Sequence, residues 1–165
     1  MELKMNTFAY PATLTPDTQN GGFEVTFVDL LEVITHGKDL ADAIHQATKC
    51  LEETIAARIS DNEFIPPPSP ANEGHCLVHL PAQMAVKTAL YNAMRNASIS
   101  KTELAKRLNC EEQEINCLTD PHHVSELSSM ETALLTLGHQ LVIGSMPKET
   151  TLWVSMRSTH PTFFS

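Results

Sequence analysis

The sequence has no stretch of apolar residues long enough to cross a membrane. No apolar run approaches the ~20 residues that a spanning helix requires. Pro11, Pro16 and Asp17 interrupt the N-terminus where a signal peptide would have its apolar core. The four cysteines stand at positions 50, 76, 110 and 117, without the spacing of a disulfide framework. These features predict a cytoplasmic protein with reduced thiols.

The residue patterns of catalytic, cofactor and metal sites are also missing. The chain has no glycine-rich phosphate loop and no Cys-x-x-Cys pair, and the two cysteines and two histidines within residues 110–123 lack the spacing of a zinc site. Asp17, Glu24 and Asp29 are the carboxylates of the predicted hairpin itself, and strand alternation sends Glu24 and Asp29 to opposite faces. We therefore predict no catalytic residue, no metal and no cofactor, and a protein that is not an enzyme.

Acidic side chains outnumber basic ones, and the excess lies in the first half of the chain. The 165 residues carry a formal net charge of −9, of which −8 falls in residues 1–80 and −1 in residues 81–165. The first half should repel nucleic acid and attract a basic protein. The second half could approach DNA only through a local basic patch. The length allows one large domain or two small ones.

Residues 1–80 have the pattern of a small antiparallel sheet crossed by one long helix, an α+β domain. Alternation of apolar and polar residues predicts strands over 7–14, 22–29, 33–35 and 75–80. Asn20-Gly21-Gly22 predicts the turn between the first two strands. Pro11 has no amide hydrogen, so we expect it at a sheet edge or with its nitrogen facing solvent.

Between the third and fourth predicted strands, apolar residues recur every three or four positions over Asp39–Ile59, which predicts a long amphipathic helix. Residues 66–70 hold four prolines and predict a stiff, extended connector within the same domain.

Residues 81–146 form a second, all-helical domain in this prediction. A helix over 82–97 is followed by a helix-turn-helix and by a further helix. Ser128 and Glu131 are its predicted cap, and it runs through Leu137 and is closed by Gly138. Residues 140–143 suggest a short terminal strand. Residues 147–165 are expected to be a loose tail.

The helix-turn-helix lies within Lys101–Asp120. Its apolar residues fall on one face of each of two short helices, with Leu104, Ala105 and Leu108 on the first and Ile115 and Leu118 on the second. Asn109 tolerates the left-handed backbone that the turn between them requires. Two capping boxes are predicted, Ser100 with Glu103 and Asn109 with Glu112. The pattern favours a DNA-reading motif over an αα-hairpin that only builds a core.

If the motif reads DNA, two groups of side chains would contact it. The second helix would present Gln113, which can pair with adenine, Glu112, which can accept from cytosine N4, and Asn116. Contacts to the phosphate backbone would come from Arg95, Lys101, Lys106 and Arg107, and Thr102 is a further DNA-binding candidate. Three glutamates within residues 111–114 oppose phosphate approach, so we expect salt-sensitive binding. Paired half-sites require at least a dimer.

The order of these pieces resembles the HicB antitoxin family, in the branch with a C-terminal helix-turn-helix. The resemblance covers residues 8–143 and rests on the motifs NGGFEVTFVDL, THGKDLADAI, DNEFIPPPSP and ELAKRLNCEEQEINCL. It implies a partial RNase H-like N-terminal domain that binds and occludes a HicA-type toxin, a small basic ribonuclease. It also implies a C-terminal domain that binds the operator of the toxin–antitoxin operon.

Charge complementarity makes Glu24, Asp29 and Glu32 the candidate toxin-binding residues, since they lie on or near the predicted hairpin. The main alternative is a stand-alone transcription regulator whose N-terminal domain dimerises or senses a ligand. A nucleic-acid-processing enzyme is a weaker alternative, because no suitable cluster of carboxylates is present.

Overall fold

The computed structural model describes residues 4–148, so most of the predicted tail at 147–165 lies outside the described residues. Apart from the chain ends, it divides into two compact units. One unit combines Thr7–Leu51 with Pro66–His79, and the other combines Glu52–Ile65 with Leu80–Met146. Strands and one helix come first and short helices follow, so the predicted mixed α+β class is confirmed. None of the helices within residues 4–148 is long and apolar enough to cross a membrane.

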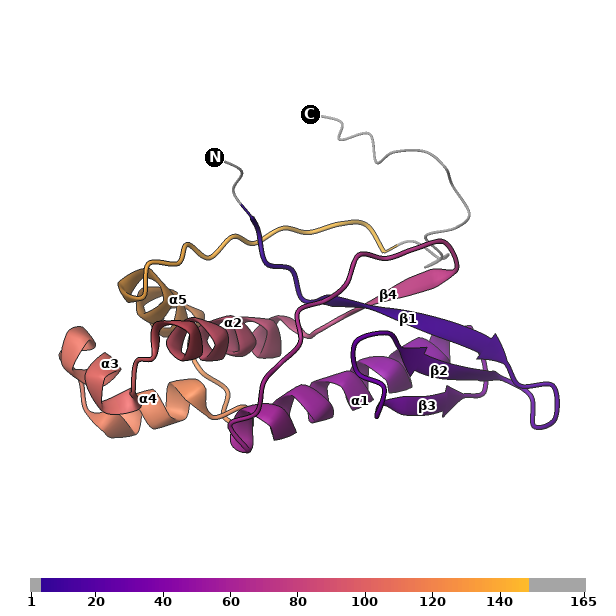
Figure 1. The fold of residues 1–165 in the computed structure, drawn as a ribbon, viewed down its shortest axis with the longest axis horizontal. Helices are drawn as coiled ribbons and strands as arrows, with labels where there is room; N and C mark the ends of the chain where they lie inside the picture. The colour runs from indigo at the N-terminus through magenta and orange to yellow at the C-terminus, as the bar shows by residue number, and fades with distance from the viewer. Residues whose placement is uncertain (1–3, 149–165) are drawn as a thin grey trace, which may run out of the picture. The chain divides into compact units, whose positions relative to one another are not determined.

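The first unit is built on a four-stranded antiparallel sheet in the order β3-β2-β1-β4 (Figure 1). The strands are β1 (Ala9–Pro16), β2 (Phe23–Phe27), β3 (Ile34–Gly37) and β4 (His75–His79). Helix α1 (Leu40–Ser60) follows β3, and its residues up to Leu51 belong to this unit. The predicted hairpin, third strand, long helix and returning strand are therefore all present, with ends shifted by a few residues.

The apolar side chains at alternate positions of β1 and β2 face the core, as the predicted strand pattern requires. Tyr10, Ala12 and Leu14 of β1 and Val25 and Phe27 of β2 are buried. They share the core of this unit with the apolar stripe of α1, which includes Ala43, Ala47 and Leu51. The first half of α1 thus covers one face of the sheet, and within the described residues Glu24, Ile34 and His36 are exposed on the other face.

Pro11 is not on an edge strand, so that part of the prediction is wrong. Strand β1 pairs with β2 on one side and with β4 on the other, and Pro11 is buried. The carbonyl of Pro11 accepts the amide of Val28 (3.1 Å), just beyond the Ala12–Phe27 pair where the β1–β2 ladder begins. An interior strand tolerates the missing amide hydrogen here because the β1–β2 ladder ends at this position, while the β1–β4 pairing continues through Pro11 and Leu77.

The second unit packs four helices around one apolar core, with the end of α1 in the same unit. The helices are α2 (Ala82–Ala97), α3 (Lys101–Leu108), α4 (Glu112–Thr119) and α5 (Leu127–Thr136). The residues predicted to face inward from the helix-turn-helix do so: Leu104, Ala105 and Ile115 are buried, and Leu108 and Leu118 pack against them. The predicted pair of short helices is therefore confirmed.

Two predicted helix starts are wrong. Helix α4 is capped by Glu111 and Glu114, which form a capping box, because Asn109 is already used as the left-handed C-cap of α3 (φ 53°). Helix α5 begins one residue before Ser128, with Glu126 as its N-cap. The cap at Ser100 is confirmed, since its hydroxyl accepts the amide of Glu103 at 3.1 Å.

The short strand predicted at 140–143 does not form. Residues 141–148 have no regular secondary structure in the described part of the chain. Leu141 packs against the helical core, whereas Val142 and Ile143 are exposed. Of the three apolar residues at 141–143, only Leu141 therefore contacts the core.

Candidate nucleic-acid interface and acidic surface

The first turn of α4 is exposed, while its opposite face anchors the helix. Residues 111–114 are all exposed, whereas Ile115 is fully buried in the core. The preceding turn is fixed by the left-handed Asn109 and by a bond from the Cys110 amide to the Ala105 carbonyl (3.0 Å). The structure therefore has two short helices joined by a tight turn, with the first turn of the second helix exposed.

The structure brings together two of the predicted DNA-binding residues from different helices. Thr102, in the first turn of α3, donates a hydrogen bond from its hydroxyl to the Glu112 carboxylate in the first turn of α4 (2.8 Å). Gln113 is exposed next to this pair, and Asn116 is half-buried one turn further along. The hydrogen bond holds the Glu112 carboxylate in a defined position at the exposed end of α4.

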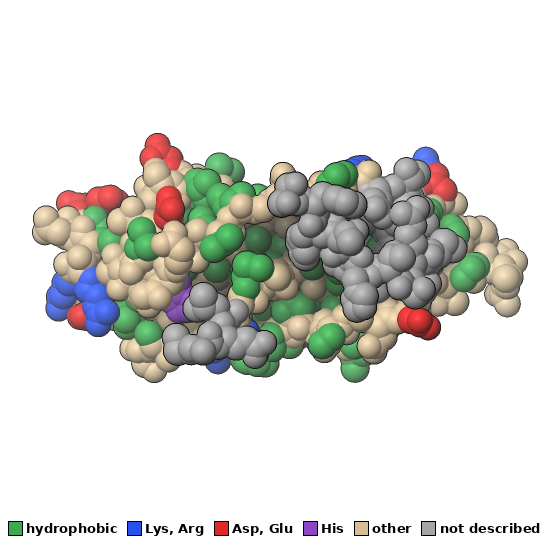
Figure 2. All heavy atoms as spheres, turned by 90° about the horizontal axis from the view of Figure 1, so that it is seen from above, with side chains coloured by type: hydrophobic (Ala, Val, Ile, Leu, Met, Phe, Trp, Pro, Cys, Tyr) green, Lys and Arg blue, Asp and Glu red, His purple; other side chains and the backbone are tan. Residues whose placement is uncertain are grey.

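The predicted phosphate-binding side chains are exposed along α3. Lys101, Thr102, Lys106 and Arg107 all lie at its surface, and Arg107 also pairs with Glu103 one turn earlier (3.2 Å). Figure 2 shows a group of Lys and Arg side chains on the side where Figure 1 places α3. A local basic group thus lies beside the acidic start of α4, although residues 52–65 and 80–146 of this unit include eleven Asp or Glu and six Lys or Arg, a net charge of −5.

Sequence reasoning missed a buried lysine beneath the C-terminal end of α4. Lys87 is only 1% exposed, and its ammonium donates to the carbonyls of Cys117 (3.2 Å) and Leu118 (2.9 Å) and to the Ser125 hydroxyl (2.9 Å). The loss of hydration lowers the pKa of the Lys87 ammonium, and the nearby Asp120 carboxylate opposes that shift. Cations are favourable at helix C-termini, so Lys87 fixes the end of α4 against α2.

The sequence contains a pattern from which the burial of Lys87 could have been predicted. Lys87 lies three residues before Leu90 and seven before Met94, on the stripe of α2 that carries the apolar core residues. A lysine on a buried stripe requires hydrogen-bond acceptors, and the end of a neighbouring helix supplies free carbonyls. Which helix end would supply them could not be read from the sequence.

Arg95 has a partner within its own unit. Its guanidinium donates to the carbonyl of Asn62 (2.9 Å), and the Tyr91 hydroxyl donates to the carbonyl of Glu63 (2.6 Å). Asn62 has a left-handed backbone (φ 55°) just after α1 ends. These bonds fasten the segment that follows α1 to α2, so Arg95 is held by the protein at the position where we expected a phosphate contact.

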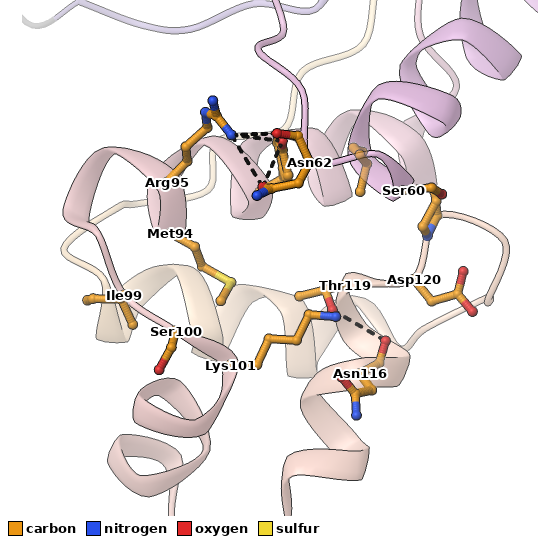
Figure 3. Close-up of a pocket in the computed structure, with 13 residues that line it drawn as sticks. Ser60, Asn62, Met94, Arg95, Ile99, Ser100, Lys101, Asn116, Thr119 and Asp120 are labelled. Atoms are coloured by element: carbon orange, nitrogen blue, oxygen red, sulfur yellow. Dashed lines mark hydrogen bonds between the residues drawn. The ribbon is translucent and has the colours of Figure 1, made fainter.

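An open cleft lies in the helical unit between the end of α1, α2 and the two helices of the helix-turn-helix. Figure 3 shows Lys101 extending across it toward Asn116 and Thr119 of α4, with Arg95 and Asn62 on the opposite side. Within residues 4–148, no three His, Cys, Asp or Glu side chains lie close enough to hold a metal ion.

The three candidate toxin-binding carboxylates have different surroundings. Glu24 is exposed on β2, on the face of the sheet away from α1. Asp29 is half-buried and accepts hydrogen bonds from both the amide and the hydroxyl of Ser69, which ties the proline-rich connector to the end of β2. Glu32 is exposed in the turn before β3. Asp29 therefore has a structural function in addition to any contact with a partner.

Comparison with known proteins gives a consistent result. A family model described as the HicB-like antitoxin of bacterial toxin–antitoxin systems matches residues 9–89. The chain is 37% identical to Antitoxin HicB of Escherichia coli (strain K12) over 132 residues, 80% of this chain and 95% of that protein. It is 31% identical to Antitoxin HicB 1 of Photorhabdus laumondii over 81% of this chain and 84% of that protein. It is 27% identical to Antitoxin HicB of Pseudomonas fluorescens (strain Pf0-1) over 74% of this chain and 85% of that protein.

Proposed function

The chain belongs to the HicB-like antitoxin family, and we propose that it neutralises a HicA-type toxin and represses its own operon. The sheet unit would be the partial RNase H-like module that binds the small basic ribonuclease. The helical unit would bind operator DNA. The protein would act by binding, without catalysis, in the cytoplasm.

The DNA-binding part of this proposal rests on the exposed first turn of α4. The tight turn at Asn109 and the buried side chain of Ile115 hold this helix in place. A recognition helix requires this combination, because its N-terminal side chains must reach base edges while the rest of the helix stays fixed. The exposed basic residues of α3 support the proposal, since they could contact the phosphates on either side of the groove.

A dimer is part of the proposal, and exposed apolar residues in the helical unit support it. Val124, Leu127 and Leu135 are 81%, 45% and 51% exposed on and just before α5. Val142 and Ile143 add further exposed apolar surface in the segment that follows. Figure 2 shows apolar side chains over the region that Figure 1 assigns to α5 and this segment. Exposed apolar surface of this kind marks protein–protein contacts.

Two experiments test the two halves separately. Co-expression with the small basic protein encoded beside this chain should relieve the growth arrest that the basic protein causes, and failure to do so would refute the antitoxin function. A mobility shift with the promoter of the same operon should show retardation that weakens steeply with salt. No retardation at low salt would refute the repressor function.

A single substitution tests the reading helix. Gln113→Ala should reduce the preference for the operator over unrelated DNA more than it reduces non-specific affinity. The matched control is Gln140→Ala, an exposed glutamine outside the helix-turn-helix, which should leave both affinities unchanged. Equal losses on both DNAs for Gln113→Ala would remove this side chain from base reading.

A further inference from the structure

One turn of the sheet unit presents a leucine to solvent on a rigid support. Residues 28–33 connect β2 to β3, and within this connection the Val33 amide donates to the Leu30 carbonyl across a turn (3.0 Å). Leu30 and Val33 are buried, at 0% and 4% exposure, so both ends of the turn are anchored in the core. Leu31, between them, is 79% exposed.

Two more apolar side chains lie beside this turn. Ile34 is 61% exposed and pairs with Thr26 across the β2–β3 ladder. Val28 directly follows β2, and its amide donates to the carbonyl of Pro11 (3.1 Å). Val28 is 40% exposed. Val28, Leu31 and Ile34, which we call the β3 patch, are thus three exposed apolar residues in the connection between β2 and β3 and at the start of β3, the edge strand of the sheet.

The surroundings of the β3 patch are acidic. Glu24 pairs with His36 on the same open face, two residues along β2 from Thr26, and Glu32 follows Leu31 in the turn. The residues of this unit, 7–51 and 66–79, include seven Asp or Glu and two Lys or Arg, a net charge of −5. A basic protein would be attracted to this surface, whereas nucleic acid or an acidic protein would be repelled.

From these observations we infer that the β3 patch is the apolar centre of the surface that binds the basic toxin. The inference rests on the proposed antitoxin function and identifies the part of the sheet unit that carries the affinity. Apolar side chains at the centre of an interface contribute most of the binding energy, and charges at its rim mainly steer association. The anchored turn holds Leu31 in place before binding, so little conformational entropy is lost when the partner docks.

The test compares substitutions that remove apolar surface without adding charge. The double variant Leu31→Ser with Ile34→Thr should weaken binding of the operon's own toxin by about 30-fold or more, mainly through faster dissociation. Its thermal stability should match the wild type, because both side chains are exposed. Phe64→Ser is the matched control, since Phe64 is 62% exposed in the other unit and should change affinity less than about twofold.

A rim substitution separates steering from affinity. Glu24→Gln should slow association and flatten its dependence on salt, with little change in the dissociation rate. The outcomes are distinguishable. If the wild-type chain does not bind the toxin, the proposed function itself fails. If the wild type binds but the double variant binds equally well, the inference about the β3 patch is overturned. It is also overturned if the double variant changes only the oligomeric mass of the free chain, which would make the patch a contact between copies.

Discussion

Replacing the buried Lys87 with methionine tests how α4 is held in place. Methionine fills most of the same volume but donates no hydrogen bond. The Cys117 carbonyl keeps a donor in Lys87→Met, because the Ser125 hydroxyl also donates to it (3.1 Å), whereas the Leu118 carbonyl loses its bond to Lys87. A buried acceptor that loses its partner costs about 1–3 kcal/mol, and loss of hydrogen bonds to a charged donor adds to this.

Removing the charge also has a favourable side, since an ammonium at 1% exposure has lost most of its hydration. We expect the loss of the Lys87 hydrogen bonds to cost more than the removal of its desolvated charge gains. Lys87→Met should therefore lose about 2 kcal/mol of unfolding free energy. Lys106→Met is the matched control, because Lys106 is exposed on α3, and it should change stability by about 0.5 kcal/mol or less. Urea unfolding followed by circular dichroism at neutral pH measures both values.

The pH dependence gives a second readout. The pKa of Lys87 is lowered in the folded chain, so the unfolded state binds more protons between that lowered value and the ordinary 10.5. Stability contributed by this group should therefore rise with pH across that window, and Lys87→Met should lack the rise. If Lys87→Met is as stable as the wild type at neutral pH while Lys106→Met is unchanged, the hydrogen bonds of Lys87 do not stabilise α4 and the reasoning is wrong.

Three further predictions follow from local geometry. Burial raises the pKa of the Cys76 thiol to about 11 from an ordinary value of 9.0, so native Cys76 should be the slowest cysteine to react with a thiol reagent at pH 8, and stability should fall as pH rises from 9 to 11. Gly37→Ala would place a methyl group 2.1 Å from the backbone of α1, so it should lower the melting temperature strongly, whereas Gly144→Ala, in open space, should not. Ser100→Ala should cost about 1 kcal/mol in unfolding free energy because it removes a cap bond, while Ser128→Ala should be neutral, and finding the reverse order would contradict the observed caps.

The sequence by itself determined the order and type of the elements, because these depend on local periodicity. Alternation placed Tyr10, Ala12 and Val25 inside the sheet unit, and three-and-four spacing placed Leu104 and Ile115 inside the helical unit, as the structure confirms. The turn at Asn109 was predictable for a similar reason, since few residues tolerate a left-handed backbone.

Only the tertiary structure decided which residues of different elements contact one another. Strand order makes β1 an interior strand, and this overturned the edge position expected for Pro11. Lys87 and Ser125 are 38 positions apart and meet under α4 only because the helices pack. The exposure of Leu31 depends on two buried neighbours, Leu30 and Val33, that anchor its turn. Periodicity reports which side of one element is apolar, but contacts between elements depend on how the elements pack, and no local pattern encodes that packing.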